Sequence, residues 1–228
     1  MKFTFFIIPL FFILPTIILS SCDNKSTVST EKARQRFFAT RDSLQKLRLD
    51  SLSKIAWGDT YFGMSVNEAL KTKTLKNAEI DKNIKYPFQT LRLFSKTNID
   101  GISAFHFYFF KDRLYLVLLA SSILSATYYD TDIKKTVNHL YELVEKKYGA
   151  PTNNYGFPSF LKMRPSESVT AYEWWIGDKH ISLEVSEVKS GSEYWAVCFI
   201  SSLKGEKIEK DYLEKTKKEE EAKKLNGF

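Results

Sequence analysis

The tightest constraint on the fold is a pair of β-strand patterns joined by a very short connection. Ile102 to Phe110 and Leu114 to Ser121 are dense in aromatic and other strand-favouring residues. Only Lys111-Asp112-Arg113 separates the two runs, which is the length of a tight hairpin turn. Because a hairpin pairs its strands in opposite directions, the chain is expected to contain an antiparallel sheet.

Three more strand patterns follow later in the chain with turns between them. They run from Val169 to Ile176, from His180 to Val188 and from Glu193 to Ser201, and they are separated by Gly177-Asp178 and by residues 189–192. Before the first hairpin, Gln89 to Phe94 also alternates apolar and polar residues. The sequence therefore predicts about six strands.

Two helix patterns precede these strand groups. Ser65 and Glu68 form a capping box, which predicts that a short helix begins at Ser65. From Asp132, apolar residues recur at helical spacing until Gly149, a glycine C-cap. We therefore predict an α+β fold, with about six strands in two helix-plus-three-strand halves and with helices on one face.

The N-terminal region has the order of a bacterial export signal. Met1-Lys2 is a short basic start, Phe3 to Leu19 is almost wholly apolar, and the run closes on Leu19-Ser20-Ser21-Cys22. This ending resembles the lipobox of bacterial lipoprotein precursors. The resemblance implies that a signal peptidase removes residues 1–21, and that Cys22 is diacylated with palmitate-type fatty acids. An uncleaved anchor is the alternative, since 17 apolar residues approach the lower limit for spanning a membrane.

The mature chain is expected to divide into four parts. We interpret 22–30 as a flexible tether, 31–56 as an amphipathic helix, 57–203 as one globular α+β domain and 204–228 as a charged helical tail. The helix at 31–56 is expected to pack on the domain, with a coiled-coil or membrane-lying role as alternatives. Two or three acyl chains would hold the protein stably on a membrane of the cell envelope, facing the periplasm.

The net charge of +7 does not indicate a nucleic-acid-binding protein. Lysine is interleaved with glutamate, no basic stripe is visible, and an exported chain does not meet the chromosome. A weak attraction to anionic lipid headgroups fits this charge better.

Short stretches of the middle region resemble small envelope lipoproteins of the β-lactamase-inhibitor-protein-like type. The resemblance lies in Phe62-Gly63-Met64-Ser65, Glu68-Ala69-Leu70 and Lys147-Tyr148-Gly149-Ala150-Pro151. It implies helices paired with antiparallel sheet and a function in binding other proteins. It carries no functional residue over to this chain.

The sequence shows no motif of an enzyme, a metal site or a cofactor site. There is no nucleophile elbow, phosphate-binding loop or dinucleotide fingerprint. His106, His139 and His180 have no partners at metal-ligand spacing, and Cys198 lies in an apolar strand, which is typical of a buried, inert thiol. We therefore expect a non-enzyme without cofactor or metal.

Strand alternation does predict a binding face. Trp175 falls on the same side of its strand as Glu173, and Trp195 falls with Phe199. A second apolar face of the sheet is then either covered by the helix at 31–56 or partly open, and Trp175, Trp195, Glu173 and Phe199 are the residues we expect to meet a partner.

Three functions are compatible with these features. The first is a lipid-anchored, non-catalytic module that binds an unknown envelope protein. The second is a lipoprotein that binds, or even hydrolyses, a small molecule or glycan with the same tryptophans and with Glu173 or Glu184. The third is a purely structural envelope protein.

Overall fold

The computed structural model describes residues 25–81, 90–97, 99–164, 166–188 and 192–225, and it divides the chain into two units, 1–44 and 45–228. The predicted signal peptide and Cys22 lie outside the described residues. Helix α1, Lys25–Lys54, begins inside the segment expected to be a tether and ends two residues before the predicted boundary at 56. Among the residues that the structure describes, no helix is long and apolar enough to cross a membrane.

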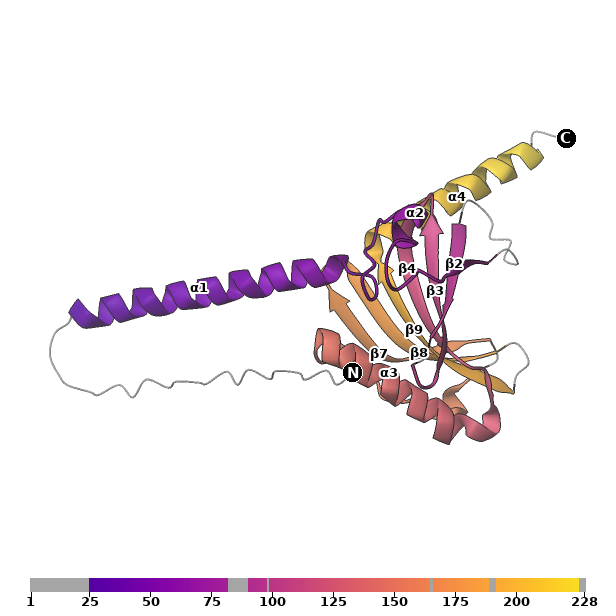
Figure 1. Cartoon of the computed structure of the whole chain (residues 1–228), viewed down its shortest axis with the longest axis horizontal. Coiled ribbons are helices and arrows are strands. Elements are labelled where there is room, and N and C mark those ends of the chain that lie inside the picture. Colours follow the sequence, from indigo (N-terminus) through magenta and orange to yellow (C-terminus); the bar gives the residue numbers. More distant parts are fainter. Residues whose placement is uncertain (1–24, 82–89, 98, 165, 189–191, 226–228) are drawn as a thin grey trace. The chain divides into compact units, whose positions relative to one another are not determined.

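The second unit is built on one antiparallel sheet (Figure 1). Its strands lie in the order β1-β2-β3-β4-β9-β8-β7-β6, and β5 pairs with β9. Six strands are long: β2 (Thr90–Lys96), β3 (Ile102–Phe110), β4 (Arg113–Ser121), β7 (Ser168–Ile176), β8 (Lys179–Glu187) and β9 (Glu193–Ser202). The other three have two residues each: β1 (Glu79–Ile80), β5 (Leu124–Ser125) and β6 (Asn153–Asn154).

The α+β class and the antiparallel pairing agree with the sequence prediction, but the described residues form nine strands instead of about six. The two strand groups join edge to edge, because β4 pairs with β9 along five residue pairs. The predicted hairpin is confirmed, and its turn places Lys111 and Asp112 at φ of 47° and 59°. These left-handed values match the turn twist that a two-residue hairpin requires.

Helix α3, Lys134–Tyr148, covers one face of the sheet (Figure 1). Val137, Leu140 and Val144 lie at helical spacing and are fully buried against strand residues such as Ile181 and Leu183. The helix ends at Gly149, whose φ of 89° confirms the predicted C-cap. Three short helical segments flank these elements: η1 (Ala126–Tyr128), η2 (Tyr129–Ile133) and η3 (Phe160–Lys162). We call this side of the sheet the helix-covered face.

The two remaining helices, α2 and α4, lie beside the sheet. Helix α2, Val66–Ala69, starts with the predicted capping box: Glu68 accepts from the Ser65 backbone N–H at 2.8 Å, and Ser65 accepts from the Glu68 N–H at 3.3 Å. Helix α4, Leu203–Leu225, forms the predicted helical tail. Its first turns pack against β4, where the Tyr115 hydroxyl donates to Glu209 at 2.8 Å.

Candidate functional site

The four residues predicted to form a binding face all lie on the side of the sheet opposite α3. Glu173 pairs with Ser182, and Ser182 pairs with Phe199. Trp175 pairs with His180, two residues further along β7 and β8. Trp195 pairs with Ser186, on the same side of β8. Because directly paired residues point to the same side of a sheet, the register places the whole set on one surface.

The register also separates the two tryptophans. Trp175 lies opposite His180 and Trp195 opposite Ser186, so their positions are six residue steps apart along β8. At about 3.3 Å per residue this distance is roughly 20 Å. The predicted binding face therefore has an apolar end at Trp195 and a polar end at Trp175 and Glu173, and Phe199 lies between them, in the same row as Glu173 with Ser182 between the two.

The apolar end is a second, smaller hydrophobic cluster. Leu118, Ala120 and Val197 are buried there beneath three half-buried rings, those of Tyr108, Trp195 and Phe199. We call Tyr108, Trp195 and Phe199 the aromatic face. Its large rings pack on aliphatic residues of β4 and β9 and still present apolar surface to solvent.

The row of paired residues extends from the aromatic face to the edge of the sheet. Leu118 pairs with His106, and His106 pairs with Phe94, whose ring lies 5.3 Å from the imidazole. Burial and the nearby Arg92 lower the pKa of His106 to about 4, so this imidazole is neutral at pH 7. Its Nδ1 is buried without a hydrogen-bond partner in the part of the chain described.

Helix α4 contacts the end of this side of the sheet where β3 and β4 meet. Phe110 is buried there, and its ring lies 5.3 Å from the ring of Tyr212. Gly205 allows the close approach, since a Cβ at this position would come within 2.5 Å of the Tyr115 Cβ. The rings of Tyr108, Trp195 and Phe199 stay partly exposed beyond this contact.

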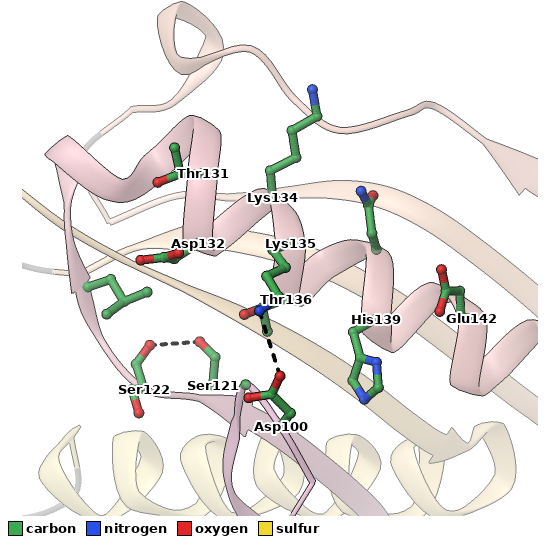
Figure 2. Close-up of a pocket in the computed structure, with 13 residues that line it drawn as sticks. Asp100, Ser121, Ser122, Thr131, Asp132, Lys134, Lys135, Thr136, His139 and Glu142 are labelled. Atoms are coloured by element: carbon green, nitrogen blue, oxygen red, sulfur yellow. Dashed lines mark hydrogen bonds and ion pairs between the residues drawn. The ribbon is translucent and has the colours of Figure 1, made fainter.

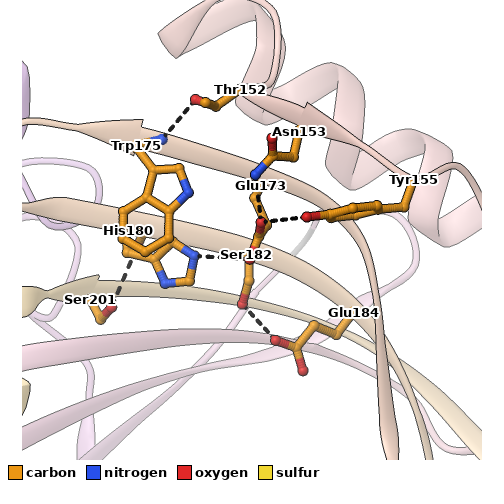
Figure 3. A network of polar contacts seen from close by, with 9 residues as sticks. All are labelled: Thr152, Asn153, Tyr155, Glu173, Trp175, His180, Ser182, Glu184 and Ser201. Atoms are coloured by element: carbon orange, nitrogen blue, oxygen red, sulfur yellow. Dashed lines mark hydrogen bonds and ion pairs between the residues drawn. The ribbon is translucent and has the colours of Figure 1, made fainter.

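The polar end is a network around Glu173 (Figure 3). Asn153 Nδ2 and the Tyr155 hydroxyl donate to Glu173 Oε2 at 2.9 and 3.2 Å, and His180 Nε2 lies 3.5 Å from Oε1. The hydrogen bond from Asn153 is the main reason why the pKa of Glu173 is lowered. Trp175 stacks on His180 with ring centroids 3.9 Å apart. We call Asn153, Tyr155, Glu173, Trp175 and His180 the Trp175 cluster.

Glu173 and Glu184 lie on neighbouring strands of this face but are not directly opposite each other. Glu173 pairs with Ser182 and Glu184 pairs with Thr170, while the Ser182 hydroxyl donates to Glu184 at 2.7 Å. The hydrogen bond from Asn153 favours the ionised form of Glu173 by lowering its pKa, which is the opposite of the shift that a general acid of glycoside hydrolysis needs.

No relative identifies this site. Comparison of the chain with protein-family models, with curated proteins and with solved structures gave no match. The resemblance to β-lactamase-inhibitor-protein-like lipoproteins therefore stays a prediction. The function has to be argued from the geometry of this sheet.

A polar cavity of about 640 Å³ lies elsewhere, beside the first turns of α3 (Figure 2). Charged residues of both signs line it, namely Lys134 and Lys135 together with Asp100, Asp132 and Glu142. The Lys135–Asp100 pair spans 3.7 Å, and both side chains are largely exposed. Such a mixed and solvated lining does not favour one class of ligand.

The other residues singled out in the sequence have structural positions. Cys198 is fully buried, and burial raises the pKa of its thiol, as an inert core cysteine requires. His139 is half-buried and lines the polar cavity. In the described part of the chain, no group of three or more His, Cys, Asp or Glu side chains is arranged to hold a metal ion.

Sequence reasoning missed three members of the Trp175 cluster: His180, which was considered only as a metal ligand, and Asn153 and Tyr155. Asn153 belongs to the two-residue strand β6, and Tyr155 follows that strand. The only local signal is the sequence Asn153-Asn154-Tyr155-Gly156 after Pro151, which is typical of a turn. Their approach to Glu173 depends on the pairing of β6 with β7, which a local pattern does not reveal.

Proposed function

We propose that this chain is a lipid-anchored, non-catalytic lipoprotein of the cell envelope that binds another protein through its aromatic face. The observation that carries the proposal is the second apolar surface of the sheet, where Tyr108, Trp195 and Phe199 remain partly exposed opposite α3. Aromatic residues that are partly exposed in a free chain are enriched in the central part of protein interfaces.

The geometry suits a rigid binding surface. All three rings project from strands within the sheet, so little side-chain and backbone freedom is lost when a partner binds. Beneath them, Leu118, Ala120 and Val197 are already dehydrated. A partner therefore needs to displace water only from the outer surfaces of the rings, which favours protein association through burial of apolar area.

The membrane attachment rests on Leu19-Ser20-Ser21-Cys22. Acylation at Cys22 would keep the domain close to the membrane, and α1 with the preceding residues would connect the lipid to the sheet. The partner is then expected to be an envelope protein that is accessible from a membrane surface. The fold supports the proposed protein-binding face in outline, because the sheet carries an apolar cluster on each of its two sides.

Exchanging residues 1–22 for a secretory signal peptide that is cleaved without lipidation is expected to release the protein from the membrane. Wild-type chain should stay in the membrane pellet after a carbonate wash, whereas the exchanged chain should lose at least nine-tenths of that fraction because it has neither acyl chains nor the apolar run 3–19. Intact-mass analysis of the wild-type chain should show cleavage before Cys22 and added fatty acids. A wild-type chain that retains residues 1–21 and carries no fatty acid would support the uncleaved anchor instead.

The same pair of strains tests the partner. Proteins cross-linked in intact cells to the tagged wild-type chain are identified by mass spectrometry, with the chain exported from the exchanged signal peptide as the unanchored control. A short set of envelope proteins that is depleted in the control is expected. An empty set under good recovery of the tagged chain would contradict the protein-binding proposal.

A further inference from the structure

Among the aromatic side chains of the described strands, Trp175 is the most exposed. It is 46% exposed, whereas its chain neighbour Trp174 is 1% exposed on the helix-covered face. One face of the Trp175 indole stacks on His180, with the two ring planes 19° apart. The ring is thereby held nearly parallel to the imidazole, and its remaining surface forms a flat apolar platform that is open to solvent.

Fixed polar groups surround this platform. The Glu173 carboxylate lies two residues away on the same strand face and is held by Asn153, Tyr155 and His180 (Figure 3). The Thr152 hydroxyl accepts from the Trp175 backbone N–H at 3.1 Å. The platform is therefore bordered by carboxylate, amide and hydroxyl groups, which together can both donate and accept hydrogen bonds.

We propose that the Trp175 cluster is a saccharide-binding site. The C–H face of a pyranose ring would pack on the exposed indole, and its hydroxyls would bond to Glu173, Asn153 and Tyr155. A sugar has the two properties that this surface complements, namely a flat apolar face and an edge of hydroxyls that donate and accept. This inference concerns another ligand and the other end of the sheet face, so it goes beyond the protein-binding function and does not depend on it.

A cationic ligand is the main competitor, because an aromatic ring beside a carboxylate also attracts ammonium and guanidinium groups. The observed contacts favour the sugar. Hydrogen bonds from Asn153 and Tyr155 fix the orientation of the Glu173 carboxylate. The Asn153 amide and the Tyr155 hydroxyl beside it are donors as well as acceptors, so a sugar hydroxyl can complement them in both directions, whereas ammonium and guanidinium groups only donate.

The test uses the full chain in a detergent without a sugar headgroup. An array of immobilised neutral, amino and acidic oligosaccharides identifies the strongest binder, and that oligosaccharide is titrated by calorimetry. Trp175→Ala and Glu173→Gln are expected to weaken binding at least tenfold. Trp195→Ala, on the same side of the sheet at its other end, should change it less than twofold. Trp175→Phe keeps a flat ring and should retain binding within about fivefold.

Three results would overturn the inference. One is the absence of binding to any oligosaccharide at millimolar concentration, and another is equal binding by wild type and Trp175→Ala. The third is a cluster that binds an arginine-rich peptide but no sugar. The thermal unfolding midpoint of each variant shows whether it is folded. If Trp175→Ala does not fold, the comparison of Trp175→Phe with the wild type still decides the test. Failure here leaves cross-linking at the aromatic face unaffected, so the two proposals are separable.

Discussion

Trp174→Ala is expected to lower the free energy of unfolding by about 3–5 kcal/mol, the usual cost of removing a large ring from a core. Trp174 is 1% exposed, its ring N–H donates to the Gly149 carbonyl at 2.9 Å, and its ring lies 6.0 Å from Tyr141 of α3. The substitution would leave a cavity under α3 and an unpaired carbonyl at its C-terminal end. Urea denaturation followed by circular dichroism measures the loss.

The adjacent tryptophan provides the matched control. Trp175 has the same side chain on the opposite face of β7 and is 46% exposed, so Trp175→Ala should cost less than about 1.5 kcal/mol, the size of one aromatic stacking contact. Equal losses for the two variants would mean that the two faces of the sheet are assigned incorrectly. The difference between neighbouring positions therefore tests the register directly.

The stability of the folded chain is expected to rise from pH 7 to pH 9 because of Lys179. This lysine is fully buried, and its Nζ donates to the Leu52 carbonyl in the last turn of α1 and to the Tyr148 hydroxyl at 3.3 Å. Burial, reinforced by the charge of Lys147, lowers the pKa of Lys179 to about 7 from 10.5. Aromatic rings of Phe62 and Tyr148 also face the amine.

The direction follows from proton binding. Between pH 7 and 10.5 the unfolded chain keeps a proton on Lys179 that the folded chain has lost, so raising the pH favours folding. One proton corresponds to about 1.4 kcal/mol per pH unit, which gives a gain of about 2 kcal/mol from pH 7 to 9. Below pH 7 both states are protonated at this site, and its contribution stops changing.

Lys179→Met is expected to abolish this pH-dependent gain, since it keeps the length of the side chain without a titrating amine. Lys135→Met, at a largely exposed lysine, should retain the gain and serves as the control. Urea denaturation at several pH values between 7 and 9 compares the three proteins. An unchanged rise in Lys179→Met would assign the effect to another group.

The long strands and α3 could be predicted because their signals are local. The hairpin around Lys111 and Asp112 follows from two strand-favouring runs with a short turn, and α3 follows from apolar spacing that ends at Gly149. Alternation also grouped Trp175 with Glu173 and Trp195 with Phe199, but it did not specify on which side of the sheet, relative to α3, these pairs lie.

The strand order and the layout of the candidate site were not predictable in the same way. Pairing of β4 with β9 joins Leu118 to Phe199, about eighty residues apart in the chain, and no local pattern specifies such a partner. The two-residue strands β1, β5 and β6 form because the longer strands β2, β9 and β7 have backbone groups free to pair with them. The separation of Trp175 from Trp195 likewise depends on register between strands, which alternation within one strand does not set.

Site-specific photo-cross-linking at the aromatic face tests the central proposal most directly. A photoreactive phenylalanine analogue replaces Phe199, and in a second strain it replaces Leu161, an apolar residue that is 93% exposed outside this face. If the aromatic face binds a protein, a discrete cross-linked envelope protein is expected at position 199, with at least tenfold less of it at position 161. Equal cross-linking at both positions, or none at position 199 when the protein is membrane-bound, would contradict it.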